Sequence, residues 1–223
     1  MKTKNRSADW LIRVLLTGML MMLLPSAFPA NDEESEAKVR EAIRLFFDLK
    51  TAESVEAFDK VIELTPKSAP YLWQRGLALY YAGKYKEGRK QFELHQTVNP
   101  HDVENAAWHY FCVARSSGVG AARKALLAIE GDARIPMKEL HELLAGKGTE
   151  EAVLRAAQNP ANGVAEVQNQ LCLAHLYLGL YHEALGHTEQ AKAHILNAAT
   201  TYATENYMGK TAQMHVKLRG WDK

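Results

Sequence analysis

Cysteine is scarce in this sequence: Cys112 and Cys172 are the two cysteines among 223 residues. Both lie in apolar segments typical of helices, and their separation matches no metal-binding spacing. A disulfide would require two distant helices to approach closely, so we expect buried free thiols and keep a disulfide as the alternative. No cysteine stands directly after the apolar N-terminal run, so the cysteine-linked lipid anchor of bacterial lipoproteins is not expected.

An excess of charge of one sign is absent as well. The formal net charge is +1, and residues 1–30 hold four of the 27 basic and one of the 26 acidic residues, so the remainder is close to neutral. Proteins that bind nucleic acids usually carry a strongly basic face, so we expect no nucleic-acid partner. The composition, 47% hydrophobic and 24% charged, suits one soluble helical domain.

Sequence motifs of catalysis are missing too. The glycine pair at 118–120 lacks the third glycine of a dinucleotide loop, and the segment 146–149 lacks the upstream glycine of a phosphate loop. No serine stands in a nucleophile elbow, and no acidic pair stands out from the helix surfaces. Four histidines, His175, His182, His187 and His194, do not converge by spacing alone. The sequence predicts a protein that is not an enzyme and binds no cofactor or metal. The alternative is a metal-dependent enzyme that uses these histidines.

The N-terminus carries the one long apolar run. Four basic residues at positions 2–13 precede the apolar segment Val14–Leu24, and small residues with two prolines follow up to Ala30. This order is typical of a secretory signal peptide, and the run is shorter than the roughly 20 residues of a membrane-spanning helix. We expect a signal peptide at 1–30, export to the periplasm or the medium, and a flexible lead-in at 31–36. The alternative is an uncleaved anchor, which would add membrane contact.

A helix-turn-helix unit of about 34 residues, clearest at 71–100, recurs along the chain. Gly76 lies inside its apolar first helix, where glycine costs about 1 kcal/mol relative to alanine, so we expect a neighbouring helix to approach closely. One period earlier, Phe58 and Pro66 match Phe92 and Pro100. A later copy has a constant offset of 103 residues: Gly76, Gly83, Gly88, Phe92 and His95 match Gly179, Gly186, Ala191, Ile195 and Ala198.

These positions resemble the tetratricopeptide repeat (TPR), whose pattern has a bulky residue, Leu-Gly, Tyr, a small residue, an aromatic and Pro. The resemblance implies an all-α fold, a TPR-like α-solenoid of antiparallel helix pairs with a divergent middle section, over residues 37–218. Clear repeats are expected at about 69–102 and 172–205, degenerate repeats at about 35–68 and 103–130 (with a second helix at 121–129), atypical helices at 131–160, and a last helix at 208–218 covering the open end of the stack. The residues expected to pack the repeats together are Gly76, Phe92, Trp108, Gly179 and Ala191.

The order of these elements, from about Glu53 to Leu218, is similar to bacterial envelope TPR adaptors of the NlpI type. The resemblance implies a non-enzymatic exported scaffold whose partners are peptidoglycan hydrolases or a periplasmic protease. The missing lipidation cysteine departs from that class. First helices line the concave groove of a TPR stack, so the expected partner-binding residues are Trp73, Leu77, Tyr80, Tyr81, Leu176, Leu180 and Glu183. Packing of the same side chains against neighbouring helices is the alternative, as is a structural homodimer in place of an adaptor.

Overall fold

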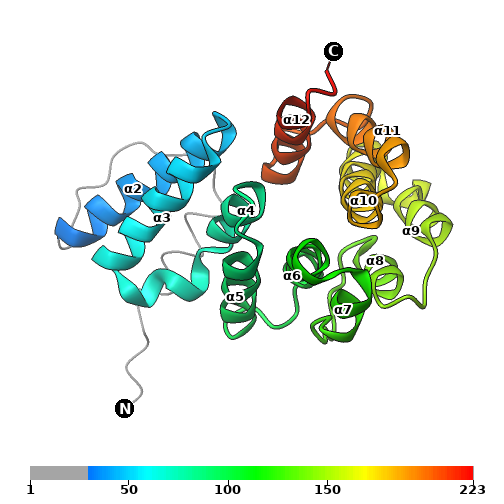
Figure 1. The fold of residues 1–223 in the computed structure, drawn as a ribbon. Helices are drawn as coiled ribbons and strands as arrows, with labels where there is room; N and C mark the ends of the chain where they lie inside the picture. Colours follow the sequence, from blue (N-terminus) through cyan, green and yellow to red (C-terminus); the bar gives the residue numbers. More distant parts are fainter. Residues whose placement is uncertain (1–29, 223) are drawn as a thin grey trace.

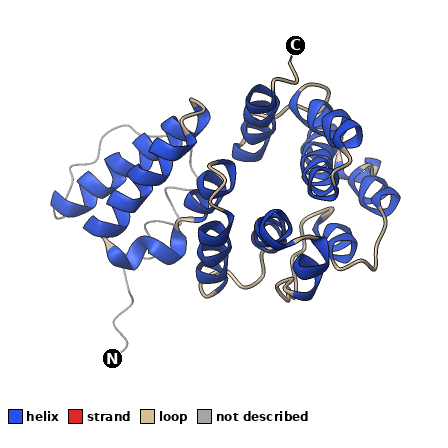
Figure 2. Ribbon diagram, viewed as in Figure 1, coloured by secondary structure: helices blue, strands red, loops and turns tan. Residues whose placement is uncertain are grey.

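The computed structural model describes residues 30–222, and over that range the chain is helical with no strand (Figure 2). The elements are α2 (Ala30–Phe47), α3 (Thr51–Leu64), η1 (Pro66–Tyr71), α4 (Trp73–Tyr81), α5 (Tyr85–Gln96), α6 (Val103–Ser117), α7 (Val119–Lys124), α8 (Met137–Leu144), α9 (Glu150–Ala157), η2 (Pro160–Asn162), α10 (Val164–Leu185), α11 (Thr188–Ala199) and α12 (Tyr207–Arg219). The predicted all-α class is confirmed. The predicted signal peptide lies outside the described residues, apart from Ala30.

Helices that follow one another in the chain pack against one another. The main contacts pair α2 with α3, α4 with α5, α5 with α6, and α10 with α11. Figure 1 shows these pairs following an arc from blue α2 round to orange α11. The last helix, α12, then returns to contact α2 as well as α10 and α11. The molecule is therefore repeat-like in its local pairing, while its two ends meet.

The turns between paired helices share one backbone geometry. After α4, Gly83 has φ 75° and donates its N–H to Tyr80, and after α10, Gly186 has φ 79° and donates to Glu183. The α2–α3 turn is made in the same way by Leu49, with φ 66°, which donates to Phe46. Left-handed φ favours glycine because a Cβ atom crowds the following carbonyl oxygen. Leu49 and Gly83 lie one period of about 34 residues apart, so the turn marks the repeat in the backbone.

We expect Leu49→Gly to stabilise the protein by about 0.5–1 kcal/mol. The substitution removes the left-handed strain of a residue that carries a Cβ, partly offset by the greater freedom of glycine in the unfolded chain. Leu49 is 38% exposed, so the packing lost from its partly buried side chain offsets part of this gain. The matched change Gly83→Leu puts a side chain into the same backbone geometry and should destabilise by about 1 kcal/mol. Urea unfolding followed by circular dichroism compares the two; changes of the same sign would contradict the shared turn.

The two helical glycines occupy equivalent contacts. An added Cβ atom at Gly76 would lie 2.4 Å from Cζ of Phe92, and one at Gly179 would lie 2.5 Å from Cγ1 of Ile195. Phe92 and Ile195 stand at the same place in the partner helices α5 and α11. Both distances are far below normal carbon contact, so each helix pair approaches to a distance that excludes any residue larger than glycine. The packing predicted from the two glycines is confirmed.

The interior is built from large aromatic side chains that cross between helix pairs. Trp108 of α6 contacts Tyr80 of α4 and Tyr177 of α10, with ring centroids 5.4 and 6.1 Å apart. Tyr207 of α12 reaches back to Phe46 of α2, at 6.1 Å. Edge-to-face and stacked rings at such separations are favourable beyond the area they bury. These contacts join helices far apart in the sequence into one core.

Several predicted boundaries differ from the structure. Residues 31–36, predicted as a flexible lead-in, belong to α2, whose early turns are supported by an ion pair of Arg40 with Glu36 at 3.2 Å. The predicted helix at 121–129 ends at Lys124, because the chain beyond it folds back on the start of α6, where Asp132 accepts the N–H of Val103. α12 lies where the last helix was predicted, but it packs between the two ends of the arc instead of covering an open one.

The two cysteines are free and buried, in α6 and α10, as predicted. Burial raises the pKa of the Cys112 thiol well above its ordinary value, which keeps it protonated and unreactive. None of the helices between residues 30 and 222 combines the length and apolar character that crossing a membrane requires.

Candidate functional site

The predicted concave groove is filled by the protein's own side chains. Leu77, Leu176 and Leu180 are fully buried and Tyr80 is 2% exposed. Contacts of α4 with α6, of α6 with α10 and of α10 with α12 take up the space that a partner was predicted to enter. The prediction that these four residues form an open binding surface is therefore wrong. The physical reason is that aromatic and leucine side chains bury more apolar area by closing the arc than by lining an open groove.

Two further groove residues link the halves of the arc by polar contacts. The hydroxyl of Tyr80 donates to Glu183 over 3.3 Å, and Arg219 of α12 donates to the same carboxylate over 2.6 Å. The hydroxyl of Tyr81 lies 3.1 Å from Nδ1 of His215, also in α12. Glu183 and Tyr81 are thus intramolecular connectors, with Glu183 at the centre of the larger network.

A cavity of about 620 Å³ lies at one end of the helices that face the centre of the arc. It is formed by the starts of α4, α6 and α12, the end of α5, and the first half of α10. We call it the end cavity. Its lining residues are Tyr71, Trp73, Leu77, Phe92, His95, Val98, Asn99, Asp102, Glu104, Asn105, Trp108, Arg134, Asn169, Leu173, Asn206, Tyr207 and Met208. Trp73 and Leu77 are the predicted partner-binding residues that lie on it.

Three residues of the end-cavity lining carry buried polar atoms that lack a hydrogen-bond partner among the described residues. The indole N–H of Trp108, Oδ1 of Asn105 and the hydroxyl of Tyr207 are buried and make no hydrogen bond with any other described residue. The amide nitrogen of the same Asn105 is held, because it donates to the carbonyl of Phe92 over 3.1 Å. A buried polar atom without a partner costs about 1–3 kcal/mol, so the wall of the end cavity holds hydrogen-bonding capacity that the protein leaves unused.

One wall of the end cavity is charged. The guanidinium of Arg134 contacts Asp102 at 2.6 Å, Glu104 at 2.5 Å and Asp132 at 2.7 Å. Tyr177 of α10 donates its hydroxyl to Glu104 over 2.5 Å. Burial raises the pKa of the Glu104 carboxyl, a shift that Arg134 opposes. Burial also acts on Asp132, but hydrogen bonds from Arg134 and the N–H of Val103 outweigh it and lower the pKa of that carboxyl.

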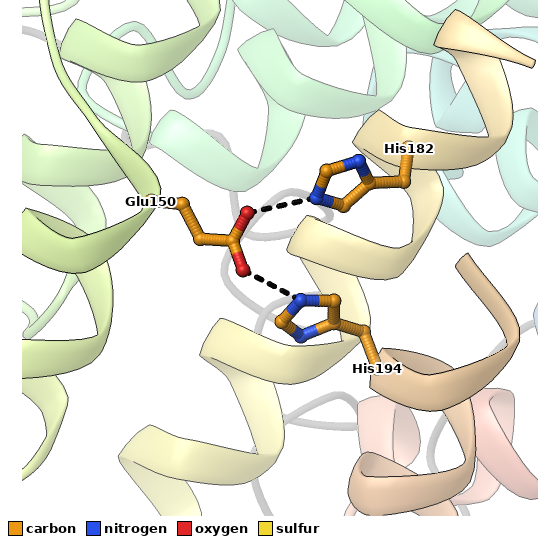
Figure 3. A group of neighbouring side chains, drawn as sticks. All are labelled: Glu150, His182 and His194. Atoms are coloured by element: carbon orange, nitrogen blue, oxygen red, sulfur yellow. Dashed lines mark hydrogen bonds and ion pairs between the residues drawn. The ribbon is translucent and has the colours of Figure 1, made fainter. Parts of the chain in front are cut away.

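A second group of polar side chains gathers where α9, α10 and α11 meet. Glu150 is the first residue of α9, and its carboxylate lies between two imidazoles (Figure 3). One carboxylate oxygen is 2.8 Å from Nε2 of His182 in α10, and the other is 2.7 Å from Nε2 of His194 in α11. The two rings are stacked, with centroids 5.4 Å apart. One ligand atom from each residue lies within 4.8 Å of the others, which makes this a candidate metal centre.

Two more histidines flank this group. Nδ1 of His175 lies 2.9 Å from Nδ1 of His194, and Nδ1 of His187 lies 3.4 Å from Nδ1 of His182. Burial, and then the neighbouring His194, lower the pKa of His175 to about 4. At neutral pH the His175 ring is therefore uncharged and able to accept or donate one hydrogen bond.

Sequence reasoning missed this convergence. His175 and His182 are seven residues apart in α10, a spacing that puts them on one helix face, and this signal was available. His194 meets them because Gly179 lets α11 approach α10, and Glu150 arrives from a helix outside the repeat pattern. The spacing of residues in the sequence does not reveal that α9 contacts α10 and α11.

A comparison of the chain with known protein families finds no family model that matches it.

Proposed function

We propose that this protein is an exported adaptor of the TPR type, without chemistry of its own, that holds a segment of a protein partner in the end cavity. The partner class that the sequence resemblance suggests is an envelope peptidoglycan hydrolase or protease. One observation carries the proposal: the end cavity has a mostly apolar lining, and three of its lining residues hold hydrogen-bonding atoms without a partner among the described residues.

An inserted peptide segment fits this combination. Its apolar side chain would pack on Trp73 and Leu173, while its backbone brings N–H and C=O groups that need partners once they leave water. Lining residues whose side chains carry hydrogen-bonding groups include Trp108, a donor, and Asn105, a donor and acceptor. The cavity volume of about 620 Å³ lies within the 300–1,000 Å³ range of pockets that enclose small ligands, and it suits a few residues of a partner.

The lining favours binding over catalysis. Among the described residues that line the end cavity there is no Ser, Thr, Cys or Lys to act as a nucleophile. His95 is fixed by the carbonyl of Pro70 at 2.8 Å, and burial lowers its pKa. The carboxylates of Asp102 and Glu104 are held by Arg134. Groups that would serve as base or acid are thus engaged in positioning the loop and the start of α6.

We expect Trp73→Ala to weaken partner binding about tenfold. Buried aromatic anchors dominate many interfaces, and a tenfold loss corresponds to about 1.4 kcal/mol. A photo-crosslinking residue placed at position 208, on the same rim, first identifies the partner in envelope extract. Purified partner is then titrated against the parent protein and the Trp73→Ala variant by calorimetry.

The control for this experiment is Leu49→Ala, which removes a partly exposed side chain outside the cavity lining and should leave affinity unchanged. Circular dichroism at 222 nm checks that both variants keep their helices. Equal affinity of the parent and Trp73→Ala proteins for the partner would refute the end cavity as the binding site.

A further inference from the structure

The cluster of Glu150, His182 and His194 shares no residue with the end cavity. It joins three helices that belong to different parts of the arc: α9 from the middle section and the α10–α11 pair. We propose that these three side chains form a Zn²⁺ site that fastens α9 to the α10–α11 pair. The proposal goes beyond the adaptor function and does not depend on it.

The three ligand atoms in the cluster favour zinc over other metal ions. Two imidazole nitrogens and one carboxylate oxygen are a common zinc ligand set, with one coordination position left for water. Imidazole ligands disfavour Mg²⁺ and Ca²⁺, which prefer oxygen. Zinc bonds of about 2.0–2.2 Å place neighbouring ligand atoms about 3.3 Å apart in a tetrahedron. The present separations run from 2.7 Å to at most 4.8 Å, so the three atoms need only small shifts to surround an ion.

The flanking histidines give the site an outer layer. A histidine that binds metal through Nε2 carries its proton on Nδ1 and donates it to a neighbour, which orients the ring. Nδ1 of His194 faces His175 at 2.9 Å, and Nδ1 of His182 faces His187 at 3.4 Å. When zinc replaces the hydrogen bonds to Glu150, the ring protons of His182 and His194 shift from Nε2 to Nδ1. His175 and His187 accept these hydrogen bonds at Nδ1, which requires their own ring protons to lie on Nε2. The protons change places within the rings, and none is released.

Access and rigidity both suit a bound ion. The side chains of His182 and His194 are 10% and 12% exposed, and that of Glu150 is 32% exposed, so the carboxylate side of the cluster is open to solvent. Both histidines stand on helices held by the Gly179–Ile195 contact. Glu150 is positioned by the helix cap at Thr149, whose hydroxyl accepts the N–H of Ala152 over 3.3 Å. A site on rigid elements loses little freedom when it binds.

The same geometry has a simpler explanation, in which Glu150 accepts two hydrogen bonds and binds nothing. The two explanations differ in an observable way, because hydrogen bonding alone requires protons on Nε2 of both histidines at all times. Zinc binding instead moves those protons to Nδ1 and raises the melting temperature in proportion to the logarithm of the zinc concentration.

The test uses the full-length chain without an affinity tag, freed of metal by a chelator and titrated with Zn²⁺ by calorimetry. We expect one ion per chain. Glu150→Gln and His194→Gln should each weaken binding at least tenfold. Imidazole ¹⁵N spectra should show the protons of His182 and His194 moving from Nε2 to Nδ1 on addition of zinc.

Matched controls are Glu151→Gln, the exposed neighbour of Glu150, and His101→Gln, an exposed histidine outside the cluster. Both should bind zinc as the parent does, and circular dichroism confirms that every variant is folded. Absence of saturable binding to the parent overturns the proposal. Binding that Glu150→Gln and His194→Gln leave unchanged overturns it as well.

Discussion

Gly179→Val is expected to lower the free energy of unfolding by about 3 kcal/mol. An added Cβ would lie 2.5 and 2.7 Å from the side-chain carbons of Ile195 and 3.1 Å from its backbone nitrogen. Ile195 is fully buried, so neither its side chain nor its backbone can withdraw without moving α11. Overpacking of a tight core costs about 1–3 kcal/mol, and the branched side chain adds atoms beyond Cβ. Chemical unfolding followed at 222 nm measures the loss.

The double variant Gly179→Ala with Ile195→Ala tests the cause of this loss. Ile195→Ala alone should cost about 2–5 kcal/mol by opening a cavity. Once Ile195 is truncated, the Cβ introduced by Gly179→Ala no longer meets its Cγ1 and Cδ1 atoms, and only the 3.1 Å contact with the backbone nitrogen remains. The two costs should therefore fall short of additivity by more than about 1 kcal/mol. Gly120→Val is the control, because an added Cβ there meets nothing within 4 Å. Additive costs would mean that Gly179 and Ile195 do not limit the approach of α10 and α11.

Arg134→Gln is expected to destabilise the protein by about 3 kcal/mol at pH 8. The substitution leaves three carboxylates close together without a cation, and Asp132 and Glu104 are only 5% and 13% exposed. Removing one partner of a buried ion pair costs about 3–5 kcal/mol; the lower end applies here because Arg134 itself is half exposed and screened by water. The measurement is urea unfolding at several pH values.

The destabilisation caused by Arg134→Gln should change with pH in a definite direction. Without the guanidinium, the pKa of Glu104 in the folded protein rises further above its unfolded value, because burial acts unopposed. A carboxyl pKa that is higher in the folded state means that the folded protein holds this proton more tightly. Glu104 therefore contributes stability below its unfolded pKa, and this contribution is lost as the pH rises through the folded pKa. Arg134→Gln should therefore cost less at pH 4.5 than at pH 8. The surface pair of Arg89 with Glu93 provides the control: Arg89→Gln should cost less than about 1 kcal/mol. A cost for Arg134→Gln that does not change with pH would contradict this account.

Local features of the fold were predictable because they depend on residues near one another in the chain. Gly76 and Gly179 indicated close helix packing, and the structure places Phe92 and Ile195 against them. The helix cap at Thr149 is also visible in the sequence. Leu49 was not predictable as a turn residue with positive φ, because the repeat forces on it a conformation that its own side chain disfavours.

The closure of the arc was not predictable, because it depends on how far each helix pair rotates relative to the last. The predicted groove residues Tyr80 and Leu180 were correctly placed on inward-facing helix surfaces, but those surfaces meet one another and α12. The end cavity arises from the same closure, since Trp73 of α4 and Tyr207 of α12 come together only when α12 has returned. A repeat pattern specifies neighbours along the stack and leaves contacts between its ends undetermined.

The return of α12 has a consequence for biogenesis. Tyr81 and His215 are separated by 134 positions along the chain, and α12 leaves the ribosome after every other described helix. Early helix pairs can form before α12 is present, but their inward aromatic faces stay exposed to water until α12 packs against them. Contacts between residues so far apart in the sequence slow the final folding step. Newly made chains of this protein should therefore expose aggregation-prone apolar surface for longer than an open helical stack of the same length.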